Sequence, residues 1–203
     1  MRRVRHAASR DQARRRREGG AAAPHAAGHH ARADGKASGV SATHTEPRLA
    51  PIVATAVHHV LNTQFHLTAE ALTEPPAAPA GYASKLQSRI DLSGARVHGE
   101  IVLSMPDALA NLLVAHMLGL PDTTTASDAD KLDLAGEFCN MLAGQIGGAL
   151  TTSGYLNDLS TPKVQRLEAG ASTDAVGKSD FDGAWRCAGL PFTLSLSLRF
   201  EPT

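Results

Sequence analysis

The stretch "DLAGEFCNMLAGQIGGAL" (residues 133–150) has the apolar spacing of an α-helix, yet it contains four glycines. At about 100° per residue, its apolar side chains form a stripe that we expect to face a core: Leu134, Phe138, Met141, Leu142, Ile146 and Ala149. A second line of residues lies on the outward side: Asp133, Glu137, Asn140, Gly144 and Gly148.

Glycine inside a helix costs about 0.5–1 kcal/mol relative to alanine. Gly136 and Gly147 flank the outward line, so little more than Glu137 and Asn140 projects from that side of the helix. We therefore expect this strip to let a partner surface come close to the helix backbone. The alternative is that the glycines fit beneath neighbouring helices and that the polar side chains are merely solvated.

The surrounding sequence indicates further elements of both kinds. Helical spacing and stop signals predict helices over 47–67, 106–121 and about 128–150, and a β-hairpin spans 85–106 with its turn at 93–95. Residues 72–84 are predicted to be a loop, and strands are predicted over 163–170, 183–189 and 190–203. In the helix 106–121 the predicted buried stripe consists of Leu109, Leu112, Leu113, His116, Met117 and Leu120.

This order of elements predicts the fold class. Strands that follow one another through short turns pair antiparallel, and the helices must cover their apolar face. We therefore expect an α/β (α+β) two-layer domain over residues 47–203, with a mostly antiparallel sheet covered by helices.

Residues 1–46 differ sharply in composition from the rest. Residues 1–45 contain ten Lys/Arg and three Asp/Glu, whereas residues 46–203 contain ten and seventeen. The segment has no aromatic residue, leucine or isoleucine, so it is predicted to be a disordered basic tail. A start codon placed too far upstream is the preferred explanation for it, ahead of nucleic-acid binding, because no aromatic residues interleave its arginines.

Several classes of protein are excluded by what the sequence lacks. No secretory h-region follows the first arginines, and no apolar run approaches the ~18 residues of a membrane span. Cys139 and Cys187 have the spacing of neither a disulfide framework nor a metal site, and His58, His59 and His66 have no acidic partner nearby in sequence. We expect a cytoplasmic domain with reduced, buried thiols and no metal of its own.

The string "DLAGEFCNMLAG" (133–144) closely resembles the signature helix of the CheC/CheX/FliY family of chemotaxis phosphatases. Members have an acidic residue, then Glu-x-x-Asn, then Asn-Met-hydrophobic-Ala-Gly on a surface helix. The resemblance continues in "SGARVHGEIVLSMPDALANLLVAHMLGLP", "STPKV" and "GLPFTLSLSL". It covers about residues 50–200. CheC and FliY typically have two such helices, whereas this sequence has one, so it is most like CheX, whose members are typically homodimers.

The resemblance implies a hydrolase that removes the phosphate from the aspartyl phosphate of a CheY-like response-regulator receiver domain. Asn140 would orient the attacking water, and Glu137 would dock on the receiver's active-site lysine. Asp133, Gly136 and Gly144 would line the binding surface. No cofactor would be held by this chain, because the Mg2+ belongs to the receiver. The alternative is a non-catalytic scaffold or interaction module of the same fold that binds a receiver or a flagellar-switch protein.

Overall fold

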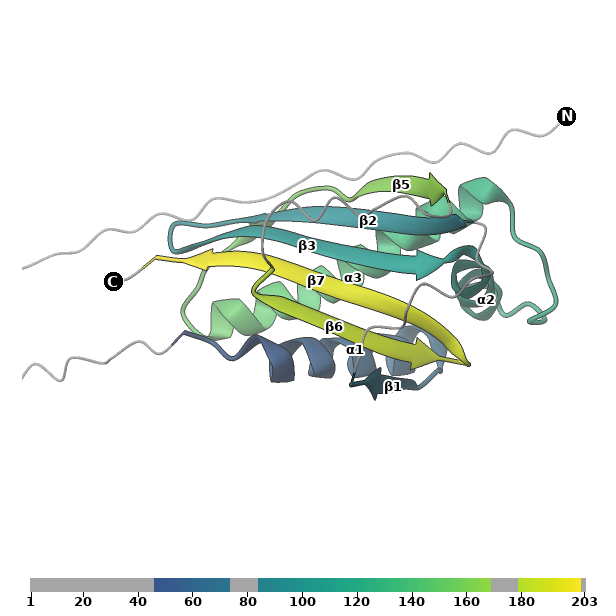
Figure 1. The fold of residues 1–203 in the computed structure, drawn as a ribbon, viewed down its shortest axis with the longest axis horizontal. Coiled ribbons are helices and arrows are strands. Elements are labelled where there is room, and N and C mark those ends of the chain that lie inside the picture. Colours follow the sequence, from purple (N-terminus) through teal and green to yellow (C-terminus); the bar gives the residue numbers. More distant parts are fainter. Residues whose placement is uncertain (1–45, 74–83, 169–178, 202–203) are drawn as a thin grey trace, which may run out of the picture. The chain divides into compact units, whose positions relative to one another are not determined.

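The computed structural model describes residues 46–73, 84–168 and 179–201 of the 203-residue chain. The predicted tail lies outside these ranges except for Glu46, as does most of the predicted loop 72–84. The described elements, in chain order (Figure 1), are α1 (Leu49–Phe65), β1 (Ala69–Leu72), β2 (Ser84–Ser93), β3 (Val97–Pro106), α2 (Asp107–Leu118), α3 (Asp128–Thr152), β4 (Asp158–Leu159), β5 (Lys163–Glu168), β6 (Phe181–Cys187) and β7 (Leu190–Phe200).

The strands form one sheet in the order β1-β6-β7-β3-β2, and the outer edge of β2 is shared by β4 and β5. Every described pair is antiparallel. The three helices lie on one face of the sheet (Figure 1). The predicted two-layer α+β class with an antiparallel sheet is therefore confirmed.

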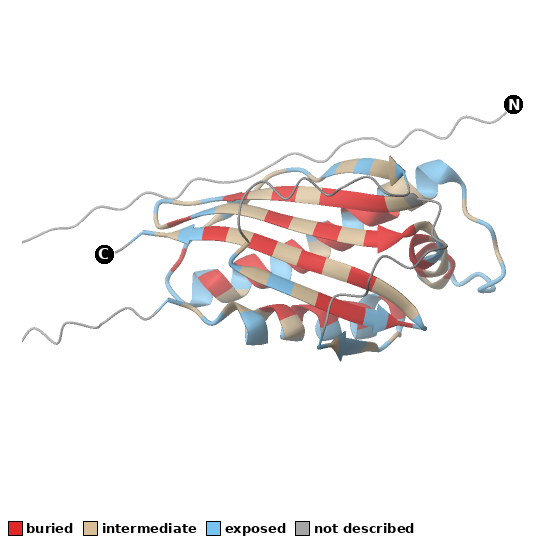
Figure 2. Ribbon diagram, viewed as in Figure 1, coloured by how far each residue is buried: buried red, intermediate tan, exposed pale blue. Residues whose placement is uncertain are grey.

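Alternation along the strands separates the two faces of the sheet. In β7 the side chains of Phe192, Leu194, Leu196 and Leu198 are buried, and the residues between them are only partly buried (Figure 2). Such a period of two is expected for a strand with one face against a core. The hairpin β2–β3 lies beside β7 and contributes further core residues from both of its strands: Leu86, Ile90, Leu92, Val97, Ile101, Leu103 and Met105.

Most of the predicted elements are present within a few residues of the predicted bounds. The three helices, the hairpin and the pairing of the terminal strand with the "GAWRC" strand are all observed. The short edge strands β1 and β4 were not predicted. The described part of the chain has no helix long and apolar enough to cross a bilayer.

The prediction that Met117 and Leu120 are buried is wrong, because they are 43% and 41% exposed. Helix α2 packs on the core through residues earlier in its sequence, including Leu109 and Leu113. It ends at Gly119, which adopts the left-handed conformation that favours glycine. The last turn of α2 thus extends past the surface that could cover it.

The position of α3 along its axis is fixed at its amino-terminal end. Ser127 Oγ accepts a hydrogen bond from Asp130 N, and the Asp130 carboxylate accepts one from Ser127 N, which forms a capping box. Arg166 of β5 donates to the carboxylates of Asp107 and Asp128, which stand in the first turns of α2 and α3. These contacts tie the start of both helices to the sheet.

The rotation of α3 about its axis is fixed by Phe138. This ring is fully buried and meets the ring of Phe65 edge-on, with centroids 5.6 Å apart, and that of Phe192, 5.9 Å away. Edge-to-face aromatic pairs contribute about 0.5–1.5 kcal/mol beyond the area they bury. Leu134, Leu142 and Ile146 continue the buried stripe, as predicted. The opposite side of α3 must therefore face outward.

Candidate functional site

The outward side of α3 presents the line of residues that the helical wheel predicts. We call Asp133, Glu137, Asn140, Gly144 and Gly148 the α3 ridge, and all five are exposed. Glu137 and Asn140 are three residues apart, about one helical turn, so they lie on the same side. The ridge thus offers two carboxylates and one amide to any surface that approaches it.

The four glycines of α3 fall into two structural classes, of which the first is buried. Gly136 lies against the segment that enters β5, where a Cβ atom would stand 3.2 Å from Val164 Cγ2 and 3.6 Å from Pro162 Cβ. At Gly147 a Cβ atom would stand 2.7 Å from Asn157 Oδ1. The structure therefore places Gly136 off the ridge, and the close approach that it permits is that of the chain's own strand.

The second class consists of Gly144 and Gly148, which are exposed. A Cβ atom at either position would meet nothing within 4 Å. The fold of this chain therefore does not require glycine there, although each glycine weakens the helix by about 0.5–1 kcal/mol. A partner surface that must lie close to the helix backbone would account for the two glycines.

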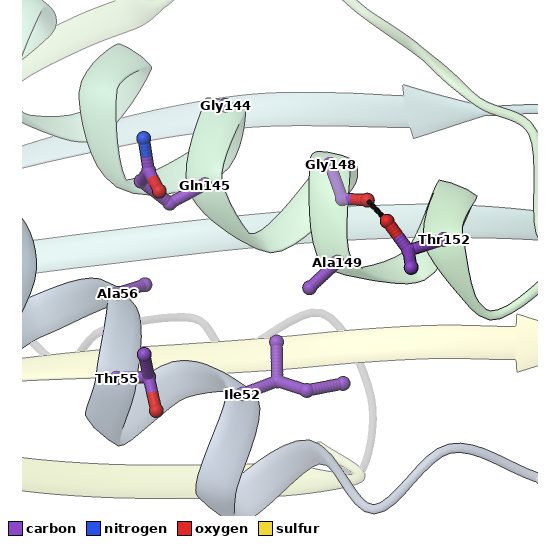
Figure 3. Close-up of a pocket in the computed structure, with 8 residues that line it drawn as sticks. All are labelled: Ile52, Thr55, Ala56, Gly144, Gln145, Gly148, Ala149 and Thr152. Carbon is purple, nitrogen blue, oxygen red and sulfur yellow. Dashed lines mark hydrogen bonds between the residues drawn. The ribbon is translucent and has the colours of Figure 1, made fainter.

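These two glycines line a groove between α1 and α3, which we call the α1–α3 groove (Figure 3). Its volume is about 530 Å³. Thr152 also lines the groove, and its Oγ1 donates a hydrogen bond to Gly148 O at 3.0 Å (Figure 3). The remaining lining residues are Ile52, Thr55, Ala56, Gln145 and Ala149. The part of the α3 ridge that consists of Gly144 and Gly148 therefore forms one wall of the α1–α3 groove.

A smaller groove of about 200 Å³ lies on the other flank of the ridge, between α2 and α3. We call it the α2–α3 groove. Its walls are Val114, Met117 and Leu118 of α2 and Asp130, Asp133, Leu134 and Glu137 of α3. The predicted site residues Asp133 and Glu137 thus share one hollow with apolar side chains of α2. The sequence pattern did not indicate this, because Met117 was assigned to the core.

The described side chains provide neither a metal cluster nor an activated thiol at the ridge. Within residues 46–73, 84–168 and 179–201, no three His, Cys, Asp or Glu side chains come together to hold a metal ion. Burial raises the pKa of the Cys139 thiol to about 11, so at neutral pH it stays protonated and unreactive. His58, His59 and His66 are exposed on or next to α1. The ridge can therefore orient and hydrogen-bond a reacting group, and its five residues include no thiol or hydroxyl group.

Residues 86–181, which include all of α3, match the family model of the chemotaxis phosphatase CheX. This domain is CheX-like. The resemblance predicted from the signature helix is confirmed. Among curated protein sequences, none matches the chain.

Solved CheX structures share the fold of this CheX-like domain. CheX from Vibrio vulnificus superposes with a TM-score of 0.63 at 19% identity, over 76% of this chain and 99% of that chain. CheX from Desulfovibrio desulfuricans gives 0.61 at 25% identity, over 74% and 99%. The structure of the CheX–CheY–BeF3–Mg2+ complex from Borrelia burgdorferi gives 0.54 at 15% identity, over 75% and 98%.

The two classes of glycine predict opposite effects on stability at adjacent positions. Gly147→Ala should lower the free energy of unfolding by about 1–3 kcal/mol, because Asn157 cannot move away easily. The two protons of its Nδ2 are shared among three acceptors, which are Gly147 O at 3.0 Å, Thr151 Oγ1 at 3.1 Å and Tyr155 O at 2.9 Å. Gly148→Ala should raise the free energy of unfolding by about 0.5–1 kcal/mol. Urea denaturation of the two variants measures both values, and equal effects would refute the distinction.

Proposed function

We propose that this chain removes the phosphoryl group from the aspartyl phosphate of a CheY-like receiver domain. Three observations support the proposal: the CheX family match, the exposure of Glu137 and Asn140 on one ridge, and the bare helix that continues from them. The exposed position of Asn140 carries most weight, because an amide buried in its own fold could not reach a partner's phosphate.

The proposed reaction is hydrolysis by a water molecule that attacks in line. The water oxygen forms a bond to phosphorus while the bond from phosphorus to the aspartyl oxygen breaks. The products are the free receiver aspartate and inorganic phosphate, which keeps the proton lost by the water. Such reactions depend on positioning and on charge stabilisation more than on a protein nucleophile. This agrees with a ridge that carries one amide and two carboxylates.

In the proposal, Asn140 orients the attacking water. A side-chain amide suits this role, because its oxygen can accept a hydrogen bond from the water while its NH2 group donates nearby. The receiver's own acidic residues hold the Mg2+, since carboxylates and phosphate oxygens are the usual ligands of that ion. This chain contributes no cofactor.

Glu137 is proposed to pair with the lysine of the receiver's active site, which sets the register of docking. A charged hydrogen bond between a carboxylate and an ammonium group is stronger than a neutral one and is directional. Gly144 is proposed to let the receiver lie against the helix backbone beyond Asn140. Homodimer formation and a cytoplasmic location remain predictions.

Asn140→Ala tests the catalytic role. Because Asn140 is exposed, the substitution should change stability by no more than about 0.5 kcal/mol. The rate constant kcat for loss of phosphate from the receiver should fall about a hundredfold or more, as when one positioned hydrogen-bonding group is removed from an active site. Asn62→Ala removes an exposed amide from α1 and is the matched control. The measurement is the lifetime of the phosphate on receivers from the same genome, and full activity of Asn140→Ala would refute the assignment.

Glu137→Lys tests the docking role. Two like charges would then face each other in the complex, so KM for the phosphorylated receiver should rise about tenfold or more. Glu46→Lys makes the same charge change at an exposed residue that precedes α1, and it should leave KM unaltered. If a receiver binds the wild-type chain tightly but keeps its phosphate as long as it does alone, the chain is a non-catalytic scaffold instead.

A further inference from the structure

Exposed apolar side chains are concentrated at one end of α2. Four large hydrophobic residues are exposed in the described part of the chain, and three of them follow one another closely: Met117, Leu118 and Leu120, with exposures of 43%, 62% and 41%. The fourth, Leu156, lies in the segment after α3. Contiguous exposed apolar surface on a folded domain commonly marks an interaction site.

This apolar surface is continuous with the proposed docking residue. Met117 and Leu118 form the α2 wall of the α2–α3 groove, and Glu137 belongs to its α3 wall. The volume of about 200 Å³ is below the ~300–1,000 Å³ of typical small-molecule pockets. The groove therefore suits a single aliphatic side chain of a macromolecular partner.

The charge around the groove indicates which partner fits. Asp130, Asp133 and Glu137 all line it. Lys131, also on α3, points elsewhere, because its Nζ lies 3.8 Å from Asp107 and 3.6 Å from Asp128. Apolar contacts beside three carboxylates are complementary to a surface that combines an aliphatic residue with a cation.

A second copy of this chain is a poorer occupant. In a two-fold symmetric dimer the same patch occurs on both sides of the interface. Three carboxylates from each copy would then be brought into one interface, and the lining of the groove contains no cation to pair with them, which is unfavourable. A receiver that presents an active-site lysine has the required charge.

We propose that the α2–α3 groove receives an apolar side chain of the phosphorylated receiver, next to the lysine that pairs with Glu137, and so selects which receiver is bound. This inference rests on the proposed phosphatase function. It assigns to Met117 and Leu118 a role in affinity and specificity, and none in the chemical step.

The double variant Met117→Ala/Leu118→Ala tests the inference on the full chain. KM for the phosphorylated receiver should rise about tenfold, as for the loss of an apolar anchor at an interface, while kcat stays within about twofold because the water-orienting amide is untouched. Leu156→Ala truncates a 72% exposed leucine elsewhere and should leave both constants unchanged. The urea midpoint of the double variant should equal that of the wild type, since both side chains are exposed.

A second variant, Leu118→Lys, places a cation at the groove opposite the receiver's lysine. It should raise KM further than the double alanine variant, because the new cation replaces part of the apolar wall and offsets part of the negative charge of the groove. Added salt should then raise KM less steeply than it does for the wild type, because less attraction is left to screen. An unchanged KM in both variants, with an active wild type, overturns the groove proposal and leaves the phosphatase function standing. A wild-type chain that neither binds nor dephosphorylates any receiver overturns the phosphatase function and this inference with it. Sedimentation equilibrium gives a separate readout: conversion of a wild-type dimer to a monomer by the double variant would assign the patch to a second copy and overturn the proposal.

Discussion

The packing of Phe138 between Phe65 and Phe192 determines what α3 presents to solvent. Successive residues of a helix are separated by about 100°, so once this ring is fixed every other side chain of α3 has a set direction. The adjacent residue, Glu137, is turned away from the sheet for that reason. The capping box at Ser127 and the ion pairs of Arg166 fix the remaining freedom, which is sliding along the axis. A core contact therefore positions a surface carboxylate.

The same helix uses glycine for two unrelated purposes. Gly136 and Gly147 let α3 lie close to the β4–β5 side of its own domain, and a methyl group at either would meet atoms of this chain at 3.2 Å or less. Gly144 and Gly148 meet nothing. A helical wheel separates the two pairs only approximately, since it contains no information on what packs against each side. Gly136 and Gly147 could be assigned to the buried class only once the structure placed Pro162, Val164 and Asn157 against them.

Periodicity in the sequence predicted the elements with strong patterns and missed those without one. The stripe of α3 and the alternation of β7 extend over many residues, so their type and their buried faces were predictable. Strands β1 and β4 have four and two residues, too few for a period to be recognised, and they form only by pairing at the sheet edges. Met117 and Leu120 continue the apolar spacing of α2 beyond the part that packs on the core. The exposure of Glu137 and Asn140 followed from the wheel, whereas the chemical roles proposed for them came from the family resemblance.

The α3 ridge lies between two grooves, and its exposed Asn140 lines neither of them. A free acyl phosphate that reached this amide would lie outside both grooves and in contact with bulk water. Under the proposed function the catalytic cavity exists only while two proteins are joined, with each contributing part of its lining. Small phosphorylated metabolites would then not be hydrolysed, because the complete active site forms only when the two proteins are bound to each other.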